Sequence, residues 1–117
     1  MKADFLNHLH ALPQPPDGRY LIGTPFIRAL SHGSMSVELF APSTSGIGRD
    51  IQQPHTQDEL YVVQCGTSSF WLDGQRLEVQ TGDVLFVSAG KEHHFDHFSQ
   101  DFASWVVFYG PQGGEKT

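Results

Sequence analysis

A succession of short apolar runs, beginning at Tyr20, constrains the fold of this chain more than any other feature. Each run is enriched in β-branched and aromatic residues, and Gly, Pro, Ser or Asp separate it from the next. The runs recur about every ten residues and predict strands at 20–22, 26–30, 34–41, 59–65, 68–73, 75–80, 83–88, 93–98 and 103–109. Many short strands at this interval, with little helix among them, predict an antiparallel sandwich or barrel.

The turns between these strands support the same prediction. In "LDGQRL", Asp73-Gly74 supplies the positive φ angles that a tight two-residue hairpin turn requires. In "QTGDVLFV", residues 81–83 turn the chain into another apolar strand. The longest loop covers 41–52 and leads into a polar segment that begins at Gln53.

The two ends of the chain differ from its centre. Residues 1–18 are predicted to form a helix and a linker, because apolar residues recur at helical spacing before "PQPPDG" ends the helix. Residues 19–110 are predicted to form the β-barrel. Residues 111–117 contain too little apolar surface to be ordered by burial, so they are predicted to form a flexible tail.

Charge and cysteine content exclude several classes of function. Thirteen acidic and seven basic residues give a net charge of −6, and the basic residues are scattered, so we expect no nucleic-acid partner. The single cysteine, Cys65, excludes an internal disulfide framework and a multi-cysteine zinc site, and it favours a reducing compartment. No run is long and apolar enough to span a bilayer or serve as a signal peptide, so we expect no membrane partner and a cytoplasmic location.

Polar residues alternate directly before the apolar run that starts at Leu60. The alternating residues are Gln53, His55, Gln57 and Glu59. In a strand all four would point to the same face, which could be a solvated face or the interior. A second polar group, the histidines of "KEHHFDH", follows another apolar strand. Buried carboxylates and imidazoles need partners, and a divalent metal ion would bind both.

Two motifs of this chain resemble those of the cupin family. In "HTQDELYVVQCG", His55 is followed after three residues by Glu59 and after six more by Gly66, as in the latter half of the first cupin motif. "GDVLFVSAGKEHHFDH" matches the second motif in its spacing from Gly82 to His93. Fifteen residues separate the two motifs, and the resemblance covers roughly residues 34–109.

The chain departs from the cupin pattern at four positions. Gln53 stands where the first motif has its leading histidine, and the glycine of that motif is found at Gly48, one residue closer than usual. In the second motif, Ser88 replaces proline and His97 stands where asparagine is usual. The change at Gln53 is the one that affects a metal ligand.

The resemblance implies an all-β double-stranded β-helix, that is, a jelly-roll or cupin barrel. It also implies a divalent metal ion, iron, manganese, nickel or zinc, bound by Gln53, His55, Glu59 and His93. Two histidines and one glutamate are similar to the facial triad of non-haem iron sites, and Gln53 would be a weak fourth ligand through its amide oxygen.

Four further residues have weaker predictions. Gln57 shares the inward parity but is a spacer in the cupin motif. His94 should point away from His93, whereas His97 should either line the pocket or have a structural role. Cys65 is predicted to be a buried, inert thiol.

Two functions are consistent with this site. One is a metalloenzyme, a dioxygenase or an isomerase, acting on a small oxygen-bearing organic molecule. The other is a non-catalytic module that binds a metal or small ligand, such as a sensor or an accessory protein. The resemblance also implies a homodimer, in which strands from residues 20–30 would pair across a two-fold axis and cover exposed sheet edges.

Overall fold

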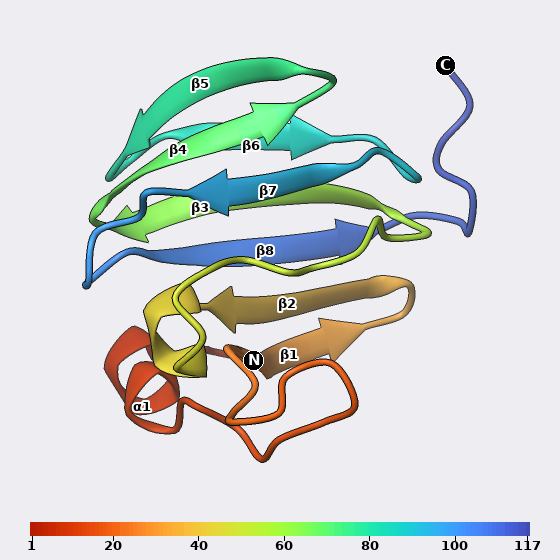
Figure 1. Ribbon diagram of the computed structural model, residues 1–117. Helices are drawn as coiled ribbons and strands as arrows, with labels where there is room; N and C mark the ends of the chain where they lie inside the picture. Colours follow the sequence, from red (N-terminus) through yellow and green to blue (C-terminus); the bar gives the residue numbers. More distant parts are fainter.

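Eight strands and one short N-terminal helix make up the fold in the computed structural model, which describes residues 1–117 (Figure 1). In chain order, the elements are α1 Phe5–His10, β1 Phe26–His32, β2 Met35–Phe40, the 3-10 helix Pro42–Ser45, β3 Asp58–Cys65, β4 Thr67–Leu72, β5 Gln75–Gln80, β6 Val84–Val87, β7 His93–Asp96 and β8 Ala103–Tyr109. The helix has six residues, and no helix of the chain is long and apolar enough to cross a membrane.

The strands form two antiparallel sheets that face each other. One has the order β1-β2-β8-β3-β6, and the other has the order β5-β4-β7. Strands that are distant in sequence, such as β2 and β8, are therefore hydrogen-bonded neighbours, as in a jelly roll. The predicted all-β barrel with a short N-terminal helix is confirmed.

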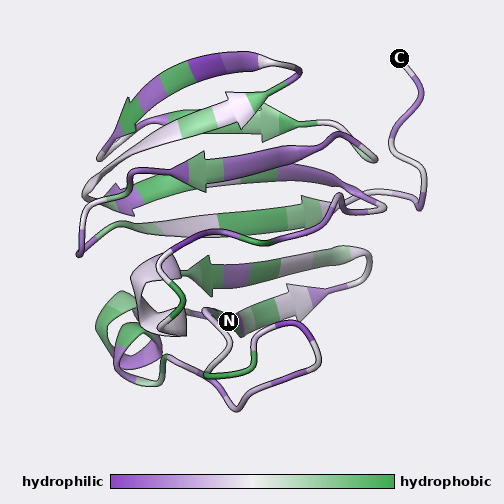
Figure 2. Cartoon of the chain, viewed as in Figure 1, coloured by the Kyte–Doolittle hydropathy of each residue, from purple (hydrophilic) through white to green (hydrophobic).

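Aromatic rings fill most of the space between the sheets. Strand residues alternate between the two faces of a sheet, so every second side chain of β3 and β8 enters the core. Figure 2 shows hydrophobic bands on these strands. The main cluster of buried side chains consists of Phe40, Tyr61, Val63, Phe70, Val79, Val87, Phe95, Phe102, Val106 and Phe108. A smaller cluster lies on the other face of the five-stranded sheet, where α1 packs against Leu39 and Trp105.

Most predicted strands are present, but residues 20–22 do not form one. The carboxylate of Asp17 accepts hydrogen bonds from the backbone N–H groups of Arg19 and Tyr20, both at 2.8 Å. These donors are therefore satisfied locally in a turn, and Leu21 is left 78% exposed. The predicted hairpin turn at Asp73-Gly74 is confirmed, with φ angles of 51° and 74°.

The start of β3 is tied to two other segments by the buried side chain of Asp58. Its carboxylate accepts hydrogen bonds from the backbone N–H groups of Ala89 and Glu115, both at 2.9 Å. These bonds lower the pKa of Asp58. They hold the loop before β7 and part of the C-terminal tail against β3, a contact that the polar composition of the tail did not indicate.

Candidate metal centre

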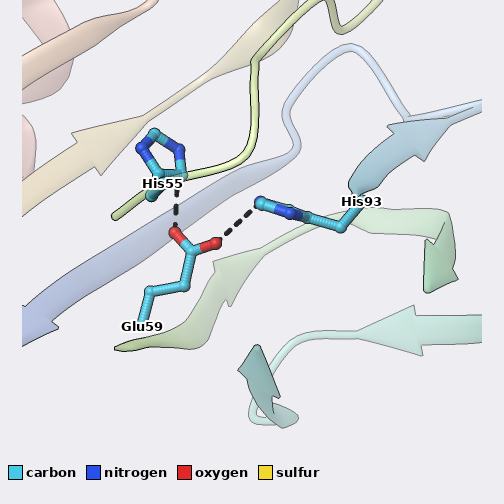
Figure 3. A group of neighbouring side chains, drawn as sticks. All are labelled: His55, Glu59 and His93. Carbon is cyan, nitrogen blue, oxygen red and sulfur yellow. Dashed lines mark ion pairs between the residues drawn. The ribbon is translucent and has the colours of Figure 1, made fainter. Parts of the chain in front are cut away.

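His55, Glu59 and His93 meet between the two sheets (Figure 3). Glu59 is on β3, His55 is in the segment before β3, and His93 is the first residue of β7 in the opposite sheet. One potential ligand atom from each residue lies within 4.8 Å of the others. Two residues near in sequence and one distant residue therefore surround a single point.

The carboxylate of Glu59 is at the centre of this cluster and is only 1% exposed. Its Oε1 lies 2.7 Å from Nε2 of His93, and its Oε2 lies 3.8 Å from Nε2 of His55. Neither oxygen has a hydrogen-bond partner beyond these imidazoles. Because a buried carboxylate is costly without a positive partner, a cation at this point, either a protonated imidazole or a metal ion, would stabilise Glu59.

His93 is oriented by Nδ1, the ring nitrogen that does not face Glu59. Nδ1 lies 2.9 Å from the carbonyl oxygen of Lys91, and because a carbonyl can only accept, Nδ1 carries a proton. Nε2 then faces three oxygens, those of Glu59, of the Tyr61 hydroxyl at 3.0 Å and of the Gln52 amide at 3.1 Å. Burial lowers the pKa of His93, but the interaction with Glu59 outweighs it and the pKa is raised. A proton and a metal ion would therefore compete for Nε2.

Gln52, rather than Gln53, lies beside the cluster. The amide nitrogen of Gln52 donates to Oδ2 of Asp50 at 2.6 Å, and its amide oxygen accepts from the Tyr61 hydroxyl at 2.8 Å. Gln53 is exposed. The structure thus brings together three of the four predicted ligands and places Gln52 where Gln53 was expected.

The reason for this difference lies in the backbone. The prediction placed Gln53 by the spacing of the cupin motif, in agreement with an alternation continued back from the strand, but β3 begins only at Asp58. Asp50 instead accepts a hydrogen bond from the backbone N–H of Gln52 at 3.1 Å, a local Asp turn that rotates Gln52 inward. The Asp two residues before Gln52 is the only sequence indication of this turn.

His55 completes the cluster in an environment that is less polar than that of His93. Its ring centroid lies 4.7 Å from that of Phe108, and its Nε2 lies 3.4 Å from the amide oxygen of Gln52. Burial lowers the pKa of His55, with Glu59 opposing this effect. A neutral imidazole is the form that binds a metal ion, so this environment favours the ligand state.

Sequence reasoning missed two residues that support the cluster. Asp50 accepts a hydrogen bond from the backbone N–H of Phe95 at 2.9 Å as well as from Gln52, and burial raises its pKa. Tyr61 is buried, and burial raises the pKa of its hydroxyl well above the ordinary value, so the hydroxyl stays protonated. Tyr61 reads as an ordinary core residue in an apolar strand, and only the fold reveals its hydroxyl at the site.

The remaining candidates lie outside the cluster. The amide nitrogen of Gln57 donates to the carbonyl oxygens of Ser34 and Gly110, so it joins two loops. His97 has a φ of 51°, which ends β7, and its side chain is 73% exposed, so of the two roles left open for it the structure does not support lining of the pocket.

Two other side chains agree with their predictions to different degrees. His94 is exposed and stacks on Trp71, as expected for a residue that points away from His93. Cys65 is only partly buried, and burial raises the pKa of its thiol, which keeps it unreactive.

Comparisons with known proteins agree with this architecture. The model of the cupin domain family matches residues 37–109, more than half of the chain. An uncharacterized protein of Streptomyces coelicolor, SCO3923, is 37% identical over 112 residues, which cover 96% of this chain and 99% of that protein.

Two solved structures show the likeness in fold. A cupin-2 domain containing protein from Shewanella frigidimarina has a TM-score of 0.64 at 14% identity, over 89% of this chain and 90% of that one. The DMSP lyase DddQ from Ruegeria pomeroyi has a TM-score of 0.57 at 15% identity, over 73% of this chain and 46% of that one. At these identities the likeness concerns the fold alone.

Proposed function

We propose that this chain, which belongs to the cupin domain family, binds a divalent metal ion through His55, Glu59 and His93. The observation that carries the proposal is the buried carboxylate of Glu59, which lies 2.7 Å from Nε2 of His93 and 3.8 Å from Nε2 of His55. A metal ion at this point would neutralise the carboxylate and use the free nitrogen of each histidine.

The donor set fits a borderline transition metal. Two imidazole nitrogens and one carboxylate leave open coordination positions, and iron, manganese, nickel and zinc all accept such ligands. The amide oxygen of Gln52 lies within hydrogen-bond distance of His93 and is proposed as an additional neutral ligand. When bound, the metal would act as a Lewis acid for the oxygen atoms of a small organic ligand.

The supporting residues hold the donors in place. The Lys91 carbonyl fixes the ring of His93, and Asp50 fixes the amide of Gln52. The protonated Tyr61 hydroxyl donates to the amide oxygen of Gln52 and lies beside His93, so it helps to hold both groups in position. The ring of Phe108 lies beside His55 and provides an apolar wall on that side of the site.

The proposed activity is oxygenation or isomerisation of a small oxygen-bearing molecule. A non-catalytic metal- or ligand-binding module is the second candidate, supported by the neutral amide of Gln52, which would bind the metal more weakly than a third imidazole. Incubation of the metal-loaded protein with enols, diketones and hydroxy acids distinguishes the two. Turnover or oxygen consumption supports the enzyme, and a ligand recovered unchanged supports the binding module.

Metal titration by calorimetry tests the metal site itself. Glu59→Gln keeps the size of the side chain but removes its charge, and it should lower the affinity for Ni(II) or Mn(II) at least tenfold. Glu78→Gln removes an equivalent charge from an exposed side chain on β5 and should leave the affinity unchanged. Equal affinity in wild type and Glu59→Gln would refute the ligand assignment.

We also propose that two copies associate through the outer face of β3 and β6. Val84 and Phe86 on the edge strand β6 are 57% and 52% exposed, and they lie opposite Val62 and Leu60 of β3. This patch of four side chains carries no charge, so a second chain of net charge −6 can approach it without close repulsion. The other edge strand, β1, has a register irregularity between residues 28 and 30, which makes pairing across that edge less favourable.

A further inference from the structure

A cavity of about 380 Å³ opens beside the proposed metal site. Of the three proposed ligands only His55 lines the cavity, with Phe108 beside it, so a molecule in the cavity would approach the metal from the side of His55. Polar side chains line this cavity together with the rings of Tyr20, Phe26 and Phe108, so its walls offer both polar and apolar surface. Its size suits a small organic molecule with several oxygen atoms.

Arg28 brings an unpaired positive charge to this cavity. It lies on β1 directly opposite Glu38 of β2, and both residues line the cavity. The Arg28 side chain is exposed and has no ion pair or side-chain hydrogen bond, whereas the other arginine on a strand, Arg76, pairs with Glu78 at 3.1 Å. An unpaired guanidinium at the wall of a cavity is suited to a carboxylate, which it can bind through two parallel hydrogen bonds.

Tyr20 supplies an independent indication that the cavity holds a ligand. The residue is 4% exposed, yet its hydroxyl has no hydrogen-bond partner. Buried hydroxyl groups almost always have partners, so this one is available to an oxygen-bearing molecule in the cavity that it lines.

Glu38 determines where an anionic group can bind. Burial raises the pKa of Glu38, Arg28 opposes this effect, and Glu59 adds to it. Because Glu38 lies directly opposite Arg28, a ligand carboxylate on Arg28 would be repelled by ionised Glu38, and the burial that raises the pKa of Glu38 reduces this repulsion. The metal and Arg28 are therefore the two places where the cavity favours negative charge.

We propose that the cavity binds a small 2-hydroxy acid with a second carboxylate, and that Arg28 binds this second carboxylate. The 2-hydroxy acid end would face the metal site, so the inference rests on the proposed metal-binding function. Arg28 thereby acts as the residue that selects dicarboxylates over monocarboxylates.

Matched pairs of acids test this inference with the Ni(II)-loaded protein. Malate and 2-hydroxyglutarate carry the second carboxylate, whereas 2-hydroxybutyrate and 2-hydroxyvalerate have a methyl group in its place. Calorimetry should show that the wild-type protein binds each diacid at least tenfold more tightly than the monoacid of the same carbon number. Nickel content is measured after each titration, so that removal of the metal by the acid is not mistaken for binding.

Variants assign the preference to Arg28. Arg28→Gln should abolish the preference for diacids and leave nickel binding unchanged, and Arg28→Lys should retain part of it. The control Arg49→Gln removes the same charge from an exposed residue and should keep the full preference.

Three results would overturn the inference in distinguishable ways. Nickel binding without a preference for diacids would overturn this inference and leave the proposed function intact. A preference that survives in Arg28→Gln would overturn the role of Arg28. Failure of the wild-type protein to bind nickel or any other divalent metal would overturn the proposed function and this inference together.

Discussion

Replacement of Tyr61 by phenylalanine removes one hydroxyl from the centre of the proposed site without changing the core packing. The ring would keep its edge contacts with Phe70 and Phe95, whose centroids lie 5.9 and 5.0 Å away. The lost hydroxyl donates to the Gln52 amide oxygen at 2.8 Å and lies 3.0 Å from Nε2 of His93. Each such bond contributes about 1 kcal/mol, so Tyr61→Phe should lower the free energy of unfolding by about 1–3 kcal/mol.

Urea denaturation in the presence of EDTA measures this loss without any contribution from bound metal. Tyr20→Phe is a matched control, because the buried hydroxyl of Tyr20 has no hydrogen-bond partner. Its removal should leave the free energy of unfolding unchanged or raise it. Equal losses in the two variants would refute the reasoning, since they would show that the network around Gln52 contributes nothing specific.

Three further predictions follow from the site and the surface. In EDTA, the raised pKa of His93 makes its pairing with Glu59 stabilising below a pH of about 6.5, and this contribution should be lost as the pH rises through the raised value. Denaturation curves across pH should therefore differ from those of Glu59→Gln, and parallel curves would contradict the pairing. Gln52→Ala should weaken nickel binding about tenfold in calorimetry, whereas Gln53→Ala should not, and the opposite order would restore the family-based assignment. Phe86→Glu should convert a dimer to a monomer in gel filtration with light scattering, and a monomeric wild type would refute the dimer.

The positions of the strands along the chain could be predicted because the relevant information is local. Alternating apolar residues and turn residues such as Asp73-Gly74 act over a few positions, so nearly every predicted strand is present. The predicted strand at 20–22 is wrong, because the side chain of Asp17 occupies the backbone donors that a strand would need. A side chain that caps a turn has a larger effect here than strand propensity.

The candidate site could be predicted where it follows the spacing of the two family motifs, and this includes His55 in the segment before β3. The position of Glu59 follows from the motif, and His93 follows from the second motif. The contribution of Gln52 does not follow from either motif, because it depends on the turn at Asp50 in a segment without regular structure. The hydroxyl of Tyr61 is likewise hidden in the sequence, because the partners that give it a role come from other parts of the chain.

The most direct test of the central claim is an anomalous diffraction map from crystals grown with Ni(II) or Mn(II). The proposed site predicts one strong peak per chain, about 2.0–2.2 Å from Nε2 of His55, a carboxylate oxygen of Glu59 and Nε2 of His93. No peak at this point, or a peak bound only by exposed histidines such as His94 or His97, would contradict the account.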